Sequence, residues 1–278
     1  RDTERTLEGI LDAAKSLTNA DGGTLYQVTE DNHLKFEILR NDTLSISLGG
    51  TTGVAIPFDP LPLNDAQGKP NNSMVVAYSV LHDATINIED AYTADGFDFS
   101  GTREFDLKTG YRSKSFLTVP MKNHEGEIIG VLQLINAKHA ETGEIIPFSK
   151  ADQRLTESLA SQAAIALTNR ILINQLEALF ESFIKLINIA IDEKSPYTGG
   201  HCERVPVLTM LLAEAACATR EGPLGDFQMP DKERYELKIA ALLHDCGKIT
   251  TPVHVVDKST KLQTLFDRYF LHVRKQRI

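Results

Sequence analysis

The chain of 278 residues carries 29 basic and 38 acidic side chains, and its net charge of -9 excludes a nucleic-acid groove over the whole surface, because phosphate binding needs basic patches. With 42% hydrophobic and 24% charged residues, the composition is typical of a globular protein in water, and the length suits two domains. No apolar run approaches the roughly 20 residues of a membrane helix, so we expect no membrane span and no nucleic-acid polymer as a partner.

The N-terminal stretch and the cysteines indicate the cellular compartment of the protein. The first residues, RDTERTLEGI, are charged and lack the apolar core of a signal peptide. Cys202, Cys217 and Cys246 form neither a disulfide framework nor a CxxC metal motif. We therefore expect a cytoplasmic protein. Because the chain begins without Met, we expect a piece excised or processed from a longer protein.

The first part of the chain alternates helix and strand patterns. Apolar residues recur at helical spacing over residues 2–19, and the stretch ADGG (20–23) breaks that pattern. The stretches GTLYQV (23–28) and HLKFEIL (33–39) predict strands joined by the polar turn TEDN. Residues 41–74 are rich in Gly, Pro, Asn and Asp, which favours loops.

Further along, residues 72–83 predict a short helix, and two apolar strands flank NHEGE within residues 115–138. Gly126 in that stretch indicates the turn of a β-hairpin. The first part is therefore predicted to be α+β, with an antiparallel sheet and helices packed against it.

A long helix is predicted next. Ser149 and Asp152 resemble a capping box, and no Gly or Pro follows until about Asp192. Apolar residues recur at threes, fours and sevens over about 40 residues, which would extend about 60 Å. Two helices with a kink near residues 169–174 are one interpretation. We favour one connecting helix whose apolar seam pairs with a second copy, which makes a homodimer.

The last third is helical in pattern. The stretch KSPYTGG (194–200) ends the long helix, and further helices are predicted over residues 201–218 and 231–247. The Pro- and Gly-rich stretch EGPLGDFQMP separates these two. Another helix is predicted within residues 266–278.

Within this last third, His244 and Asp245 end an apolar run. Metals that activate water for attack on phosphorus use imidazole and carboxylate ligands, which His201 and this pair supply from two helices. Neighbours on a helix point about 100° apart, so His244 and Asp245 can share a metal only near a helix end, which Gly247 is expected to supply. Lys248 is well placed as a point charge on a substrate phosphate.

The alternative for these residues is structural. A buried histidine is commonly a hydrogen-bonded core residue, and Asp245 could form an ion pair with Lys248 or Arg204.

A family resemblance favours the metal. The stretch HDCGKITTPVHVVDKSTKL (244–262) resembles the signature of the HD phosphohydrolase superfamily in its HD-GYP branch, and AIDEKSPYTGGHCERV (190–205) is similar to that branch's opening motif. The resemblance implies an all-α domain with His201, His244 and Asp245 as metal ligands, iron or manganese as the metal, and a water or hydroxide nucleophile. Lys248 and Asp245 would take part in catalysis, and the implied reaction is hydrolysis of cyclic di-GMP.

The later motifs of that branch are absent from the chain. These are a further His, a His-His pair, the GYP loop and a final Asp, and His272 lies near but not on an expected position. We therefore expect weak divalent-metal binding and slow or no hydrolysis. A non-catalytic ligand-binding and dimerisation module is one alternative. An HD phosphohydrolase for another nucleotide is the other, which the PYTGGH opening disfavours.

The first part also resembles a known family. NIEDAY, TGYRSKS, VPM and GVLQLIN follow in order over residues 87–136, and the region is similar to GAF domains of cyclic-nucleotide phosphodiesterases and adenylyl cyclases. The resemblance implies an antiparallel sheet with a small-molecule pocket, capped by loops from about residue 50 to 115.

The ligand of that pocket is left open by the sequence. Cyclic-nucleotide GAF domains carry an Asn-Lys…Phe-x3-Asp-Glu signature, and here Lys138 is displaced by one position and Gln153 replaces the Glu. A cyclic nucleotide, another small molecule and no ligand at all are the three possibilities.

The resulting prediction has three parts: a GAF sensor (1–168), a connecting helix (169–193) and an HD-GYP-type domain truncated at its C-terminus (194–278). We expect a bacterial signalling protein in which the sensor regulates a metal-dependent phosphodiesterase with a cyclic dinucleotide substrate.

Overall fold

The computed structural model describes residues 2–65, 67–194, 200–252 and 255. The chain forms two compact units, residues 1–173 and 174–278, and the boundary falls inside one long helix. The helix predicted within residues 266–278, with His272, lies outside the described residues, as does most of the turn predicted at 194–200. In the part that is described, no helix is both long enough and apolar enough to cross a membrane.

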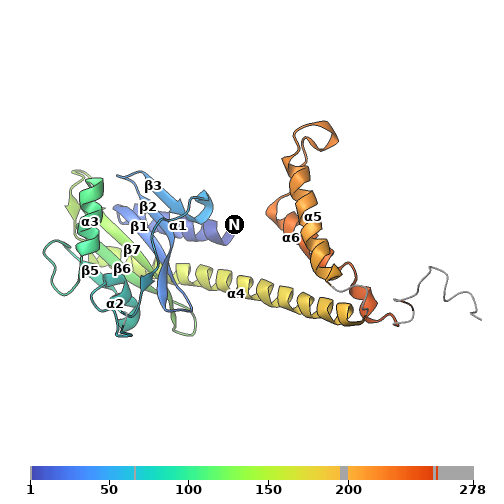
Figure 1. Cartoon of the computed structure of the whole chain (residues 1–278). Coiled ribbons are helices and arrows are strands. Elements are labelled where there is room, and N and C mark those ends of the chain that lie inside the picture. Colours follow the sequence, from blue (N-terminus) through green and yellow to red (C-terminus); the bar gives the residue numbers. More distant parts are fainter. Residues whose placement is uncertain (1, 66, 195–199, 253–254, 256–278) are drawn as a thin grey trace, which may run out of the picture. The chain divides into compact units, whose positions relative to one another are not determined.

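In the first unit, the described strands form one antiparallel sheet (Figure 1). The strands are β1 (Ala20–Val28), β2 (His33–Asn41), β3 (Ile46–Gly49), β4 (Leu61–Pro62), β5 (Ile86–Ile88), β6 (Phe116–Lys122), β7 (Ile128–Lys138) and β8 (Ile145–Ile146). Their order is β3-β2-β1-β7-β6-β5, with β4 beside β2 and β8 beside β7. The α+β architecture predicted for this part is confirmed.

Helices cover both faces of this sheet. They are α1 (Asp2–Leu17), α2 (Val75–His82), α3 (Ser100–Thr109) and the first part of α4 (Lys150–Lys194), with a short 3-10 helix η1 (Gly50–Thr52). Side chains of α1 and α4, including Leu11 and Leu167, form one buried core with one face of the strands. Side chains of α2 pack on the opposite face, where α3 also lies (Figure 1). The second face keeps room for a pocket.

Glycine allows close approach at the centre of the sheet. The expected break at residues 20–23 is wrong, because β1 begins at Ala20 and runs through the glycines. A side chain at Gly23 would place its Cβ 2.7 Å from Leu11 Cδ1, so glycine lets α1 pack closely on β1. At Gly130 a Cβ would lie 2.3 Å from the Tyr26 carbonyl oxygen, which leaves no room for any side chain.

Other local predictions are confirmed or corrected by the structure. The hairpin of β6 and β7 forms, with Gly126 at φ 84. The capping box also forms: the Asp152 carboxylate accepts from the Ser149 backbone N–H at 2.8 Å, and Ser149 Oγ accepts from the Asp152 N–H at 3.1 Å. The region of about residues 50 to 115, which the resemblance implied to be capping loops, contains α3, whose apolar pattern is too weak to be recognised in the sequence.

Helix α4 is continuous through residues 169–174, so the interpretation with two kinked helices is wrong. In the first unit, Arg170 of α4 pairs with Glu37 at 2.8 Å and donates to Gln27 Oε1 at 2.8 Å. These contacts tie the helix to β1 and β2.

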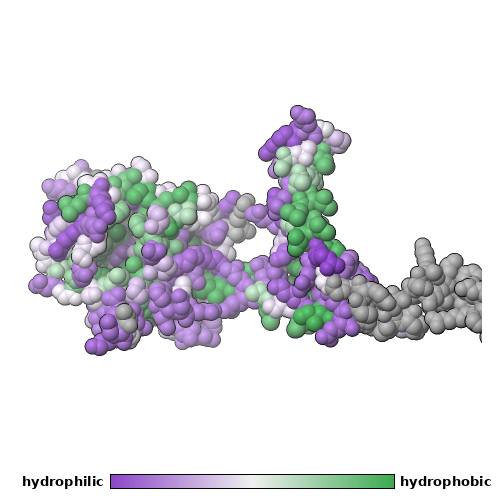
Figure 2. Space-filling view, viewed as in Figure 1, coloured by the Kyte–Doolittle hydropathy of each residue, from purple (hydrophilic) through white to green (hydrophobic). Residues whose placement is uncertain are grey.

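The second unit is helical in its described part. It contains the end of α4, α5 (His201–Ala218), η2 (Gly222–Leu224), α6 (Asp231–Leu243) and η3 (Cys246–Ile249). Lys238 of α6 binds both carboxylate oxygens of Glu181 on α4, at 2.9 and 3.0 Å. Figure 2 shows an apolar surface over α5, where Leu208 and Leu212 are 59% and 73% exposed. The described helices therefore leave part of an apolar face uncovered.

Candidate metal centre and ligand pocket

The end of α6 brings two of the predicted metal ligands to one point. The helix ends at Leu243, and Gly247 lies in η3, so the expectation that Gly247 ends this helix is wrong. The His244 ring takes part in the ending instead, since its Nδ1 lies 2.7 Å from the Ala241 carbonyl oxygen. The last carbonyls of a helix have no intrahelical partner, and this side chain supplies one.

The predicted metal ligands converge. His201 is the first residue of α5, and its Nε2 lies 3.1 Å from Nε2 of His244. Asp245 Oδ2 lies 3.1 Å from His244 Nε2 and 3.6 Å from His201 Nε2. One ligand atom from each of the three residues lies within 4.8 Å of the others. The sequence motif and the fold therefore bring the same three side chains together.

The ring geometry leaves coordinating atoms available. The Ala241 carbonyl can only accept, so His244 Nδ1 must carry its hydrogen, and the Nε2 of a neutral ring keeps its lone pair. Two imidazole nitrogens at 3.1 Å need a proton or a cation between them. Two nitrogens about 2.1 Å from one metal and at right angles would lie about 3.0 Å apart, so the donor set fits a divalent metal.

Asp245 is held in its charged form. Burial would raise its pKa, but the hydrogen bond from Lys248 and the Coulombic interactions with His244, Lys248 and His201 outweigh burial and lower the pKa. Lys248 Nζ lies 2.6 Å from Asp245 Oδ2, so the ion pair weighed as a structural alternative is present. All four side chains, those of His201, His244, Asp245 and Lys248, are partly exposed, from 18% for Asp245 to 41% for His201.

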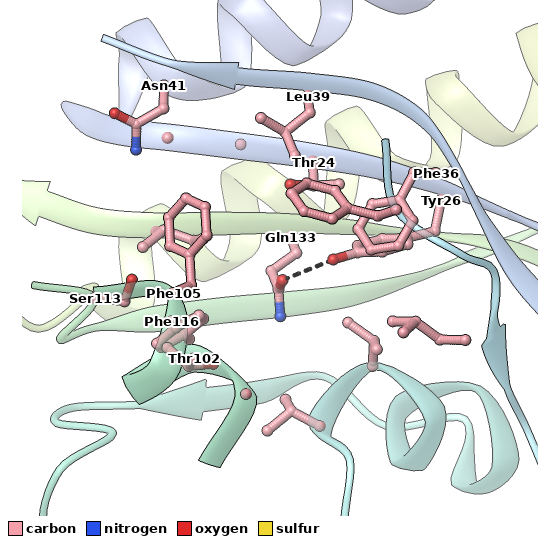
Figure 3. A pocket seen from close by; sticks show the side chains of 18 of the residues that line it. Thr24, Tyr26, Phe36, Leu39, Asn41, Thr102, Phe105, Ser113, Phe116 and Gln133 are labelled. Carbon is pink, nitrogen blue, oxygen red and sulfur yellow. Dashed lines mark hydrogen bonds between the residues drawn. The ribbon is translucent and has the colours of Figure 1, made fainter. Parts of the chain in front are cut away.

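A cavity of about 650 Å³ lies between the sheet and helices α2 and α3 of the first unit. Figure 3 shows Gln133 of β7 in its middle, with Tyr26 and Phe36 on one side and Phe105 and Phe116 on the other. The Tyr26 hydroxyl donates to Gln133 Oε1 at 3.3 Å. Burial raises the pKa of Tyr26, so this hydroxyl stays protonated. The volume suits a small-molecule ligand.

The positive charge that lines this pocket is already engaged in an ion pair. Among the described residues that line it, Arg40 is the only cation. Its guanidinium pairs with Glu8 at 2.7 Å and donates to the Leu39 and Leu48 carbonyl oxygens at 2.9 and 2.6 Å. Arg40 therefore braces the wall of the pocket and has little left to offer a ligand phosphate.

A buried polar network closes one end of the pocket. Tyr111 lines the cavity and donates to Asp21 Oδ2 at 2.6 Å, and Asn136 Nδ2 donates to the Tyr111 hydroxyl at 2.9 Å. Lys138 pairs with the other oxygen of Asp21, whose side chain is only 1% exposed. Lys138 thus has Asp21 as its partner, and Asp152 is used in the cap of α4.

Sequence reasoning missed this network. Asp21 lies in the stretch that was expected to interrupt the helical pattern, and its role depends on pairing between β1 and β7. The only available signal was Lys138 itself, displaced from the family signature. Burial alone would raise the Asp21 pKa, but hydrogen bonds from Lys138, Tyr111 and Thr43 and the Lys138 charge lower it.

The first unit is similar to known proteins. A family model described as GAF domain matches residues 2–167, and the chain belongs to this family. The chain is 37% identical over 95 residues to the dual 3′,5′-cyclic-AMP and -GMP phosphodiesterase 11A of Takifugu rubripes, covering 34% of this chain and 10% of that protein. It is 37% identical over 86 residues to the 3′3′-cGAMP-specific phosphodiesterase 3 of Vibrio cholerae serotype O1, covering 31% and 16%.

Among solved structures, the GAF domain/HD domain protein from Geobacter sulfurreducens has a TM-score of 0.43 and 15% identity, covering 62% of this chain and 95% of that one. The chain spans about a tenth and a sixth of the length of the two phosphodiesterases.

Replacing Asp21 tests the buried network. A carboxyl with a lowered pKa in the folded state stabilises above its unfolded pKa of about 3.9, and this contribution is lost as pH falls through the folded value. We expect Asp21→Asn to lower the free energy of unfolding by about 2 kcal/mol at neutral pH, with a smaller loss in acid. Urea unfolding, followed by the NMR signals of β1, measures the free energy of unfolding at both pH values. The exposed Asp95→Asn is the control, and an equal loss at both pH values would contradict the network.

Proposed function

We propose that the GAF unit is a sensor that regulates a metal-dependent phosphodiesterase of HD-GYP type, formed by residues 194–278. The observation that carries this proposal is the convergence of His201, His244 and Asp245 beside a lysine. Imidazole nitrogens with a carboxylate oxygen suit iron or manganese. The signature around these residues resembles that of the HD-GYP branch.

The side chains have separable tasks in this proposal. His201 and His244 would hold the metal through their Nε2 atoms, and Asp245 through Oδ2. A bound metal supplies a lowered pKa for attacking water and polarises the phosphoryl group. Lys248 would exchange its contact with Asp245 for a substrate phosphate oxygen, where its charge offsets the charge that develops during displacement.

A cyclic dinucleotide is the proposed substrate class, and cyclic di-GMP is the first candidate because the HD-GYP resemblance implies it. The Vibrio cholerae relative, named for 3′3′-cGAMP, makes that dinucleotide the second candidate. The exposed apolar face of α5 fits a domain that packs further helices on it, and the later HD-GYP motifs do not occur in these 278 residues. Weak metal binding and slow or no turnover are therefore expected of these 278 residues.

Metal uptake tests the proposed centre. We expect the chain to bind Mn²⁺ measurably, and Asp245→Ala to abolish that binding, because it removes the charged ligand. Isothermal titration calorimetry gives the affinity, and His124→Ala, at an exposed histidine of the first unit, is the matched control. Unchanged binding by Asp245→Ala would favour the non-catalytic module. Hydrolysis of cyclic di-GMP at the rate of a protein that carries all the later motifs would contradict the expected slow turnover.

The sensor pocket is proposed to bind a small molecule with a flat aromatic group. Aromatic side chains line both sides of the cavity, and its one cation is committed to the wall. Stacking and apolar contact would then give most of the affinity. Cyclic nucleotides fit this description through their bases.

Comparison of a nucleoside with its cyclic nucleotide tests this pocket. We expect guanosine and cyclic GMP to bind within about tenfold of each other, because Arg40 is not free to reward the phosphate. Leu39→Trp should fill the cavity and block both, whereas Leu107→Trp, at a residue 86% exposed on α3, should not. Calorimetry measures the affinity of each chain for guanosine and for cyclic GMP. A far larger preference for cyclic GMP, or binding of neither probe, would contradict the proposal.

Helix α4 is proposed to pair with the same helix of a second copy. Exposed apolar side chains follow each other at spacings of four and three, as in a coiled coil: Leu172, Leu176, Leu179, Phe183 and Leu186, each at least 53% exposed. The positions beside this seam, such as Gln175, Ser182 and Phe180, carry no charge, so a second copy meets no repulsion. Asn169 continues the seam and would pair with itself in a parallel dimer.

A charge in the seam tests this pairing. Leu179→Lys would bury an unpaired ammonium, so we expect the dimer to dissociate into monomers. Asn174→Lys, off the seam on the same helix, should leave the dimer intact. Sedimentation equilibrium measures the mass of each. A monomeric unaltered chain, or a dimer that tolerates Leu179→Lys, would contradict the proposed pairing.

A further inference from the structure

Asp192, near the end of α4, contacts the start of α5. Its Oδ2 accepts a hydrogen bond from the Gly200 backbone N–H at 3.1 Å. Gly200 directly precedes α5 and has φ 69, a left-handed conformation that favours glycine. The first N–H groups of a helix lack intrahelical partners, and a carboxylate here also benefits from the helix dipole. Asp192 therefore fixes the residue before His201.

The residue after His201 is also held in the interior, since Cys202 is fully buried. His201 therefore lies between a buried residue and Gly200, whose backbone N–H is bound by the Asp192 carboxylate. The hydrogen bond from Gly200 thus holds the backbone directly before His201 in the first turn of α5.

Asp192 also has an oxygen without a hydrogen bond. Among the described residues, Asp192 Oδ1 and, one helical turn earlier, Asn188 Oδ1 are buried and unpartnered. Such atoms cost stability, and a stable core alone would not favour keeping them. Their cost is understandable if the carboxylate is needed where it lies.

We propose that Asp192 is a positioning residue of the metal centre, which orients His201 by holding the Gly200 backbone directly before it. This inference rests on the proposed metal function of His201, His244 and Asp245. The His201 ring turns about only two side-chain bonds, so the backbone of the first turn decides where Nε2 lies. Held in place, His201 Nε2 lies 3.1 Å from His244 Nε2 and 3.6 Å from Asp245 Oδ2. Asp192 itself need not touch the metal.

Two substitutions of Asp192 by side chains of similar size separate a positioning role from a direct effect of its charge on the metal. Asp192→Leu keeps the volume and removes the acceptor, and we expect Mn²⁺ affinity to fall about 10- to 100-fold, as for outer partners of metal ligands. Asp192→Asn keeps an oxygen that can accept from Gly200, so most of the affinity should return. Glu193→Ala, at the exposed neighbour, is the control and should leave affinity unchanged. Calorimetry measures affinity, and circular dichroism checks that helical content is retained.

A measurement on the unaltered chain needs no substitution. The Gly200 amide proton should exchange with solvent more slowly than an exposed amide, and the Asp192→Asn chain should retain that protection. A Gly200 amide that exchanges freely would overturn the proposal even if Asp192→Leu fails to fold.

The remaining outcomes are distinguishable. If the unaltered chain binds no Mn²⁺, the metal centre and this inference both fail. If the unaltered chain and Asp192→Leu bind equally well, only the positioning role is overturned. If Asp192→Asn is as weak as Asp192→Leu, the charge acts directly on the metal, and the positioning role is again overturned.

Discussion

The close approach of two imidazole nitrogens, His201 Nε2 and His244 Nε2 at 3.1 Å, is the constraint on which the account of the second unit depends. Neither nitrogen can be satisfied by the other unless a proton or a cation lies between them. The His244 ring has its other nitrogen fixed by the Ala241 carbonyl, and Asp245 adds a negative charge at 3.1 Å. Two imidazole nitrogens beside one carboxylate suit a cation, and the Lys248 ammonium already contacts that carboxylate at 2.6 Å.

In the first unit, the two faces of one sheet have different roles. One face is closed by α1 and α4 into a dry core, and glycines at positions such as Gly23 and Gly130 let the layers approach. The other face is left open enough for a cavity of about 650 Å³. Buried ion pairs and hydrogen bonds around Asp21 and Arg40 hold the pocket walls, and its lining is mainly apolar, both aliphatic and aromatic. Rigid walls with few free charges favour recognition by shape and stacking.

Much of this architecture could be read from the sequence because it depends on local patterns. Alternating apolar residues located β6 and β7, the capping box located the start of α4, and a helical period without Gly or Pro gave its length. The start of β1 was missed because ADGG has the composition of a turn, whereas its extended form is imposed by pairing with β2 and β7. The proposed metal ligands were named from two motifs. Asp21 and Asp192 were not assigned their contacts. Those of Asp21 are made across the sheet, and Asp192 contacts the residue before the next helix, so neither has a recognisable local pattern.

The most direct test of the central claim is where a metal binds. Crystals of the chain soaked in Mn²⁺ should give an anomalous scattering peak within coordinating distance of His201 Nε2, His244 Nε2 and the Asp245 carboxylate. Separation of Lys248 from Asp245 should accompany that peak. A metal found elsewhere, or two imidazoles that stay 3.1 Å apart with no metal between them at saturating Mn²⁺, would contradict the account.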